Sequence, residues 1–374
     1  MAVYKLYPNQ DAFLASEKPK NNTGFDEILE ISSYPTGSIG QASRALVRFK
    51  SSEITTVVNN TIGSSNFPWS ASLDLNIASA LENATTQSVY CYPVYSSWDG
   101  GTGKYGDNVT SASTDKTGCS WRFRQAEETN AWLTGSFPAN VTASFNSTHP
   151  GGGTWYTGSG GVNLEATQSL GYNADFDLDL DVTNAVKLHY SGTIDNNGFI
   201  VKLQDSLEFN MSSSIRNTYF SSNTNTIYPP ALVFKWDDSS YDHGSLGVLS
   251  SSNAVVNITN NKGEYTDEGK TRFRLLARPV NPVRTFTTGS IYKVNHALPS
   301  ASYYAIQDAY TEELEIPFDT SFTKISCDSS GPYFDIYMSG LQPERYYKVI
   351  IKSTLDGTTS VIDNDNIFKV VRNG

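Results

Sequence analysis

The stretch ALVFKW at residues 231–236 contains the pattern from which the fold of this chain can be worked out. It is short, rich in β-branched and aromatic side chains, and follows Pro229-Pro230, as a strand of a β-sandwich does. Four other runs have the same character, at residues 45–49, 198–203, 254–258 and 347–351. Helical periodicity is scarce, and short helices are predicted only around residues 79–84 and 182–186.

The composition points to the same fold class. Hydrophobic residues make up 38% of the 374 residues and charged residues only 17%, so uncharged polar side chains supply much of the polarity. Ser, Thr and Asn account for about three residues in ten, and these residues favour turns, caps and strand faces over helix interiors. Aromatic residues at 12% exclude a disordered chain, which would contain few of them. The sequence therefore predicts a packed, all-β protein.

The length and the tryptophan distribution indicate two domains. A chain of 374 residues is long for one β-sandwich. All six tryptophans precede residue 240, so the last third draws its bulk from Tyr, Phe, Ile and Val. The polar, turn-forming stretch at residues 237–244 is the natural boundary. We predict domains at residues 1–238 and 239–374.

Charge and cysteine content exclude several classes of protein. The net charge is -11, so the chain as a whole repels a phosphate backbone, and nucleic acid is not an expected partner. No stretch of about 20 apolar residues and no signal peptide is recognisable, so no membrane partner is expected and synthesis is predicted in the cytoplasm. Three cysteines are too few for a disulfide scaffold, and buried thiols are predicted. Whether Cys91 and Cys119 approach one another stays open.

A search for catalytic chemistry predicts no enzyme, no cofactor and no metal site. Residues 100–105 resemble a phosphate loop, but Trp98 stands where its first Gly belongs and Tyr105 where Ser or Thr must hold magnesium. A turn-rich loop is the better interpretation. The chain has no G-x-S-x-G motif, and the histidines lack a second His or Cys at ligand spacing. We expect these histidines to be exposed or locally bonded; they are His149, His189, His243 and His296.

Acidic and apolar residues alternate at residues 175–182, and this pattern has two interpretations. Aspartates at positions 175, 177, 179 and 181 alternate with Phe, Leu, Leu and Val, which on a strand places four carboxylates on one face. The segment lacks the Gly and the bidentate Glu that a calcium loop requires. A strand with a solvated acidic face is favoured. A cation site or a contact with a basic partner is the minority interpretation, because like charges on one face need relief.

A glycine-rich loop at residues 149–158 presents Trp155 and Tyr156. Aromatic side chains in such a loop suit a sugar-stacking platform or a contact between subunits. A surface loop whose aromatic side chains pack onto the sandwich is the favoured interpretation.

The first region contains a series of landmarks in a fixed order. They are YPNQDAF at 7–13, ALVRF at 45–49, WDGG at 98–101, CSW at 119–121, LDVTNAV at 180–186, NGFIV at 197–201 and PPALVF at 229–234. In this order they resemble the DNRLRE family, also called disaggregatase-related. The resemblance implies a jelly-roll-like β-sandwich of a kind found on secreted and surface proteins, some of which bind carbohydrate. It departs at residues 124–172, which look like a Gly/Ser/Thr-rich insertion, and at 220–224, where FSSNT replaces the usual Ser-Arg-Glu.

The second region contains a local signature. Leu341, Pro343, Tyr347, Val349 and Ile351 reproduce the L-x-P-x-x-x-Y-x-V-x-I spacing of the corner between strands E and F in fibronectin type III-like and immunoglobulin-like sandwiches. That resemblance implies that the Tyr347 hydroxyl bonds back to nearby backbone. Further strands are predicted at residues 271–276, 313–318, 333–338 and 367–371. The fold class predicted for the whole chain is a jelly-roll-like β-sandwich followed by an immunoglobulin-like β-sandwich.

Over its whole length the sequence resembles structural proteins of myoviruses that infect cyanobacteria, relatives of the T-even phages. The resemblance rests on YPNQD at 7–11, NITNNKGEY at 257–265, FRL at 273–275 with RP at 278–279, YYAI at 303–306 and PERYY at 343–347. It implies a virion component of the neck or collar, tail or baseplate, made in the host cytoplasm, with no catalytic residues.

Two functions from different classes follow from these observations. The first is a structural virion protein whose partners are copies of itself and other virion proteins, and which acts through buried, Tyr-rich contacts. The alternative is a carbohydrate-binding module or adhesin that recognises a surface glycan. The first predicts dependence on partners without glycan affinity, whereas the second predicts a monomer that binds polysaccharide.

Overall fold

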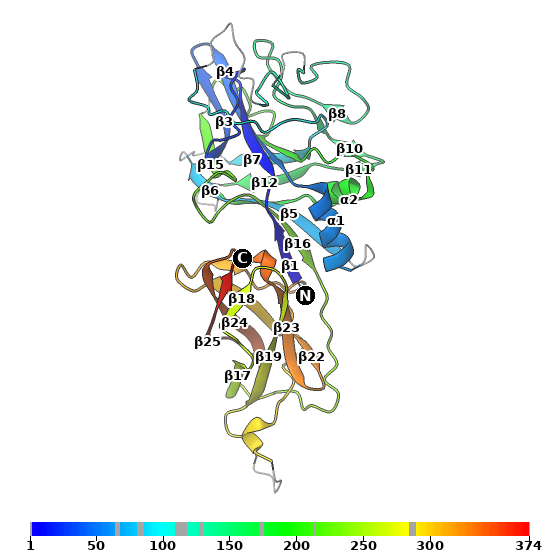
Figure 1. The fold of residues 1–374 in the computed structure, drawn as a ribbon, viewed down its shortest axis with the longest axis vertical. Coiled ribbons are helices and arrows are strands. Elements are labelled where there is room, and N and C mark those ends of the chain that lie inside the picture. The colour runs from blue at the N-terminus through cyan, green and yellow to red at the C-terminus, as the bar shows by residue number, and fades with distance from the viewer. Residues whose placement is uncertain are drawn as a thin grey trace. The chain divides into compact units, whose positions relative to one another are not determined.

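The computed structural model describes residues 2–63, 68–80, 86–108, 118–126, 130–171, 176–212, 214–283 and 289–373. The protein is an all-β sandwich protein, as predicted (Figure 1). It divides into two compact units. The first sandwich comprises Leu6–Gly63 and Ser70–Val233, and the second sandwich comprises Met1–Lys5, Ser64–Trp69 and Phe234–Gly374.

This division differs from the sequence boundary after residue 238. The compact units divide at residues 233 and 234, and the N-terminal residues group with the second sandwich. The reason is strand pairing, because β1 (Ala2–Leu6) is the neighbour of β16 (Ala231–Trp236) in a sheet. Hydrogen bonds between strands so far apart in the chain leave no signal in local composition.

The first sandwich is dominated by an eight-stranded sheet in the order β12-β7-β14-β4-β3-β15-β6, with β2 also paired to β4. A second sheet has the order β1-β16-β5-β13, and three of its strands, β1, β5 and β16, have residues in both units. The remaining strands of these sheets are β2 (Gln10–Ala15), β3 (Ile28–Thr36), β4 (Ile39–Arg48), β5 (Trp69–Leu75), β6 (Ile77–Ala80), β7 (Gln87–Pro93), β12 (Ala166–Leu170), β13 (Leu178–Asp181), β14 (Phe199–Leu203) and β15 (Ile215–Phe220). Two short pairs are β8 (Val141–Thr142) with β9 (Trp155–Tyr156) and β10 (Gly158–Ser159) with β11 (Val162–Asn163).

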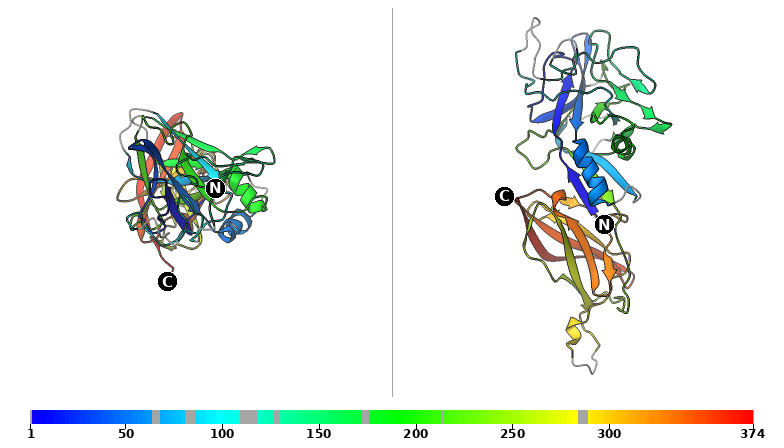
Figure 2. Two further views of the ribbon diagram at one scale, coloured as in Figure 1. Left: turned by 90° about the horizontal axis from the view of Figure 1, so that it is seen from above. Right: turned by 45° about the vertical axis from the view of Figure 1, so that its right-hand side comes forward.

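Two short helices belong to the first sandwich and lie side by side (Figure 2). The helix α2 (Thr183–Ser191) overlaps the predicted helix at 182–186. The other, α1 (Ser51–Thr56), continues into a π-helical turn, η1 (Val57–Thr61), and it was not predicted from the sequence. Its β-branched residues have weak helix propensity, but Ile54, Val57 and Val58 are buried at helical spacing, so packing decides the conformation.

The helix predicted at 79–84 is wrong over residues 79–80, and residues 81–84 lie outside the described residues. Residues 79 and 80 end strand β6, where Ser79 pairs with Thr218 and Ala80 with Asn217 in β15. Cross-strand hydrogen bonds therefore override the weak helical pattern.

The core of the first sandwich is built from tryptophans. Trp98, Trp121, Trp132 and Trp155 are each at most 2% exposed and belong to one apolar cluster that also contains Cys119. Two of these tryptophans come from the 124–172 segment, so this segment contributes side chains to the core. All three cysteines are free and buried, as predicted, and Cys91 and Cys119 are not joined by a disulfide.

A charge network is enclosed within the first sandwich. Glu208 accepts two hydrogen bonds from the Arg44 guanidinium, at 2.8 and 2.7 Å, and contacts the Lys202 ammonium at 3.0 Å. The side chains of all three residues are at most 1% exposed. Arg44 also donates to the carbonyl oxygens of Gly152 and Ser144, so the network fastens the segment that precedes Trp155 to the sheet.

The second sandwich has two facing sheets (Figure 1). One has the order β17-β19-β23-β22 and the other β18-β25-β24-β20-β21, with β18 and β25 parallel. In chain order these are sheets A-B-E-D and A′-G-F-C-C′ of an immunoglobulin-like sandwich. The strands are β17 (Ala254–Ile258), β18 (Glu264–Thr266), β19 (Lys270–Pro279), β20 (Tyr303–Asp308), β21 (Leu314–Ile316), β22 (Ser326–Asp328), β23 (Gly331–Tyr337), β24 (Arg345–Leu355) and β25 (Thr358–Val371). Single 3₁₀ turns lie at η2 (Ile291–Lys293) and η3 (Met338–Gly340).

Stacked aromatic rings fill the space between these two sheets. Phe334 of β23 stacks on Phe273 of β19 with ring centroids 5.5 Å apart and on Tyr304 of β20 at 4.4 Å. Phe273 also contacts Phe368 of β25 at 5.5 Å, which links the two sheets. The core of this sandwich is therefore aromatic and contains no disulfide.

The predicted corner is present at the start of β24. The Tyr347 side chain is fully buried, and its hydroxyl donates a hydrogen bond of 2.9 Å to the carbonyl oxygen of Gln342, five residues upstream. This is the bond that the spacing of Leu341, Pro343 and Tyr347 implied.

No helix in the described parts of the chain is long and apolar enough to span a membrane.

Candidate interaction surface

Three cations project from one face of β19. Lys270, Arg272 and Arg274 alternate with residues such as Phe273 that face the aromatic core, because side chains on a strand point to opposite sides in turn. Their side chains are 40%, 46% and 31% exposed. We call these three residues the cation row.

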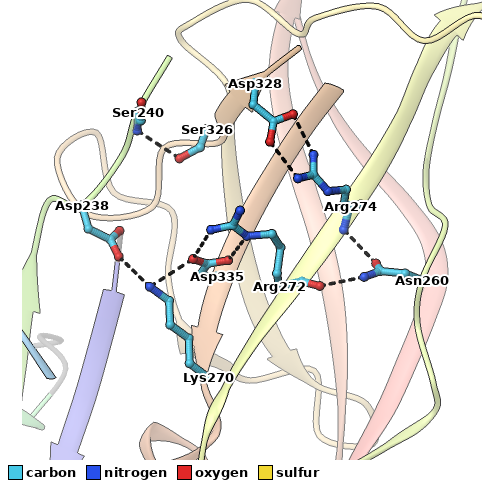
Figure 3. Close-up of polar contacts among 9 residues, drawn as sticks. All are labelled: Asp238, Ser240, Asn260, Lys270, Arg272, Arg274, Ser326, Asp328 and Asp335. Carbon is cyan, nitrogen blue, oxygen red and sulfur yellow. Dashed lines mark hydrogen bonds and ion pairs between the residues drawn. The ribbon is translucent and has the colours of Figure 1, made fainter. Parts of the chain in front are cut away.

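Each member of the cation row contacts a carboxylate from β23 or β22 of the same sheet (Figure 3). The Arg272 guanidinium donates hydrogen bonds of 2.8 and 3.0 Å to Asp335 of β23. The Arg274 guanidinium donates hydrogen bonds of 2.8 and 2.7 Å to Asp328 of β22. Lys270 contacts Asp335 at 3.0 Å and Asp238 at 3.4 Å. Both arginines are held by two parallel bonds, which fixes the plane of each guanidinium.

Two tyrosine rings of β23 pack against the side chains of the cation row. The Arg272 guanidinium lies 4.0 Å from the centre of the Tyr333 ring, and that of Arg274 lies 5.1 Å from the same ring. The Lys270 ammonium lies 5.0 Å from the centre of the Tyr337 ring. Stacking and ion pairing therefore hold the cations in place before any partner arrives.

Hydrogen bonds along the edge of the sheet add to this order. The Asn260 side chain accepts a hydrogen bond from the Arg274 backbone N–H at 2.8 Å and donates to the Arg272 carbonyl oxygen at 2.7 Å. On the far side, the Ser240 backbone N–H donates to the Ser326 hydroxyl at 3.2 Å (Figure 3). The sheet that carries the cation row is thus held by hydrogen bonds at β19 and at β22.

The electrostatics keep this surface ionised. The hydrogen bonds from Arg274 lower the pKa of Asp328 to about 2. Burial acts to raise the pKa of Asp335, but hydrogen bonds from Arg272 and Lys270 outweigh burial and lower it. The carboxylates are therefore charged at neutral pH and are paired with cations, which suits a binding surface and does not suit proton transfer.

The strand is predictable from the sequence, whereas the role of these residues is not. The signal that could have found them is the alternation Lys-x-Arg-x-Arg at 270–274, with aromatic and acidic residues alternating at 333–337. Their pairing depends on the register between β19 and β23, in which Arg272 is opposite Asp335. No local pattern reveals that register.

The loop at residues 149–158 does not provide a sugar platform. Trp155 is 2% exposed and stacks on Tyr92, with ring centroids 5.7 Å apart. Tyr156 is half-buried and packs edge-on against Tyr95 at 5.2 Å. The favoured interpretation, a loop whose aromatic side chains pack onto the sandwich, is confirmed.

The acidic segment is a strand whose exposed face is acidic, as favoured. In β13, Leu178 and Leu180 are buried while Asp179 and Asp181 are exposed. Asp177 precedes the strand and accepts a hydrogen bond of 2.6 Å from the Ile77 backbone N–H, whereas position 175 lies outside the described residues. Among the described residues, no three His, Cys, Asp or Glu side chains come together as a metal site.

The segment that resembles a phosphate loop is a turn-rich loop, as predicted. The Gly103 backbone N–H donates to the Asn22 side chain at 2.7 Å, and that of Tyr105 donates to the Asp26 carboxylate at 2.8 Å. These N–H groups are used within the fold and do not face a phosphate.

The expectation for the histidines is wrong for His189. Its imidazole lies on α2, is 8% exposed, and packs edge-on against Phe199 with centroids 5.7 Å apart. The helical spacing of Ala185, Val186 and His189 places all three on the buried face of α2. By contrast, His243 is bonded locally, since its Nδ1 contacts the Leu246 carbonyl oxygen at 2.8 Å.

Burial of His189 predicts a pH dependence. Burial lowers the pKa of its imidazole to about 4, so the folded chain keeps the ring neutral at pH values where the unfolded chain protonates it. The unfolding free energy should therefore fall as the pH drops from about 6.5 to about 4. Urea titrations at several pH values will show this slope in the native sequence and a shallower slope in His189→Leu. Equal slopes in native and His189→Leu proteins would contradict the assignment.

Several landmarks of the first region meet in space. Asp11 accepts hydrogen bonds from the Ser222 backbone N–H at 2.6 Å and its hydroxyl at 2.7 Å, although 211 positions separate the two residues. The Gln10 side chain donates a hydrogen bond to the Trp98 carbonyl oxygen at 3.1 Å. The Trp98 indole N–H donates to the Asn197 carbonyl oxygen at 2.7 Å. These residues thus link distant segments of the first sandwich. The segment FSSNT at 220–224, which stands where the resembled family has Ser-Arg-Glu, contributes to these links through Ser222.

No protein-family model matches the chain, and no curated protein matches it either.

Proposed function

We propose that this chain is a structural component of a bacteriophage virion, of the neck or collar, tail or baseplate, and acts through protein–protein contacts. The observation that carries the proposal is the cation row of the second sandwich, with its arginines stacked on Tyr333 and fixed by Asp328 and Asp335. Arg and Tyr are the residues that most often dominate binding at protein interfaces. Because the side chains are already ordered, binding a partner loses little conformational entropy.

The resemblance to cyanobacterial myovirus structural proteins supports the virion as the setting. Copies of the chain and other virion proteins are the proposed partners. The glycan-binding alternative needs exposed aromatic rings, and the loop expected to supply them buries Trp155.

Charge reversal at Arg272 tests this proposal. In particles assembled from a phage that carries the variant chain, we expect Arg272→Glu to reduce incorporation of the chain at least about tenfold, because a stacked interface arginine is worth roughly 2 kcal/mol or more. Arg272→Lys should give a smaller decrease, since it keeps the charge and loses the planar fork. The measurement is quantitative mass spectrometry of purified particles, with antibody labelling by electron microscopy to find the location.

Lys293→Glu is the matched control, since Lys293 is an exposed cation of the same sandwich outside the cation row. It should incorporate normally. Equal incorporation of Arg272→Glu and Lys293→Glu would remove the cation row from the interface. Particles that lack the native chain altogether would remove the virion proposal.

A further inference from the structure

A cavity of about 350 Å³ opens in the first sandwich beside Trp132 of the apolar cluster. Its lining includes Lys20, Arg122, Phe123, Trp132, Thr134 and Pro150. The volume is at the lower end of the range of roughly 300–1,000 Å³ found for small-molecule sites, which leaves room for a compact ligand.

The lining combines apolar walls with positive charge. Phe123, Trp132 and Pro150 supply ring surfaces, and Lys20 and Arg122 supply two cations in a chain whose net charge is -11. The Arg122 side chain is exposed, and no hydrogen bond or ion pair of its guanidinium occurs within the described residues. Arg122 thus differs from Arg44, Arg272 and Arg274, each of which grips a carboxylate.

The walls are rigid because their backbones are bonded to one another. The Arg122 backbone N–H donates to the Pro19 carbonyl oxygen at 3.0 Å, which fixes the position of the backbone next to Lys20. Phe123 and Ala131 form an antiparallel bridge, and the Trp132 indole donates to the Ser120 carbonyl oxygen at 2.9 Å.

The loop that carries Pro150 is also held closely against the wall. Gly151 adopts a positive φ of 126°, and a Cβ atom there would lie 2.2 Å from the Trp121 carbonyl oxygen. Only glycine allows this approach, which sets Pro150 against the wall. The cavity is therefore formed before a ligand binds.

We propose that this cavity binds a small organic carboxylate. The planar guanidinium of Arg122 matches a carboxylate in shape and charge. The body of the ligand lies against Pro150 and the small accessible parts of Phe123 and Trp132, which are 9% and 2% exposed, and Thr134 also lines the cavity. This site is independent of the cation row and belongs to the other sandwich.

Calorimetric titration of the full chain tests the site with matched pairs of compounds. Galacturonate and galactose share a sugar ring, and benzoate and benzyl alcohol share an aromatic ring, so each pair differs in the carboxylate. We expect the acid of at least one pair to bind and its neutral partner to bind at least about tenfold more weakly. The pair that responds identifies a saccharide or an aromatic acid as the source of the carboxylate.

Two variants locate the binding. Arg122→Gln should weaken binding of the acid at least about tenfold, whereas Arg124→Gln should not, because the Arg124 guanidinium is bonded to Ser97 at 3.1 Å and does not line the cavity. In a nuclear magnetic resonance titration, the indole N–H of Trp132 should shift while that of Trp155 stays in place.

Three results would overturn the proposal. One is the absence of binding by both acids at millimolar concentration, and another is equal affinity in native and Arg122→Gln chains. The third is binding of inorganic phosphate as tight as that of either acid, which would indicate a general anion site. Each result leaves the incorporation experiment on Arg272 unaffected, so the two proposals fail independently.

Discussion

Replacement of Glu208 by alanine is expected to lower the free energy of unfolding by about 3–5 kcal/mol. Glu208 is the shared acceptor for Arg44 and Lys202, at 2.7 and 3.0 Å, and all three side chains are at most 1% exposed. Without the carboxylate, Arg44 keeps its charge in a space that water does not reach, because a guanidinium does not lose its proton. A buried cation without its anion is among the most costly defects that a single substitution makes.

Urea unfolding followed by tryptophan fluorescence measures this effect, since four of the six tryptophans belong to the first sandwich. Glu53→Ala is the control, because Glu53 forms an exposed ion pair with Lys50 in the same unit and should cost less than about 1 kcal/mol. Glu208→Gln keeps the shape and removes the charge, so it should be destabilising as well. A Glu208→Ala chain as stable as Glu53→Ala would show that the network adds nothing to stability.

Replacement of Phe334 by alanine is expected to destabilise the second sandwich by about 3–5 kcal/mol. Its ring is 1% exposed and stacks between Phe273 and Tyr304, one from each sheet. Truncation removes apolar area and leaves a cavity that the rigid neighbouring rings cannot fill. The stacking contribution between the rings is lost in addition.

The near-ultraviolet circular dichroism of the aromatic core, followed during urea unfolding, measures this prediction. Tyr310→Ala removes an aromatic ring that is 78% exposed in the same sandwich, and it should change the unfolding free energy by less than about 0.5 kcal/mol. If Phe334→Ala and Tyr310→Ala have the same stability, the aromatic stack is not the core of this unit.

The strands could be predicted from sequence because their signal is local. Runs such as ALVFKW at 231–236 and YKVII at 347–351 are β-branched, aromatic and short, and all of the quoted runs form strands. The Tyr347 corner could also be predicted, since the bond spans only five residues. The helix around Ile54 was missed for the opposite reason, because its β-branched Ile and Thr residues favour strands and the packing of its buried face makes it helical.

The sequence by itself therefore determined the all-β class, the free buried cysteines and the immunoglobulin-like corner, each of which depends on composition or on neighbours in the chain. Only the tertiary structure decided which distant residues meet: β1 with β16, Asp11 with Ser222, Glu208 with Arg44, and Arg272 with Asp335. The physical reason is that strand register and the burial of charges are set by contacts between segments far apart in the chain, such as Asp11 and Ser222, which are 211 residues apart. A one-residue shift of register would turn the cation row toward the aromatic core.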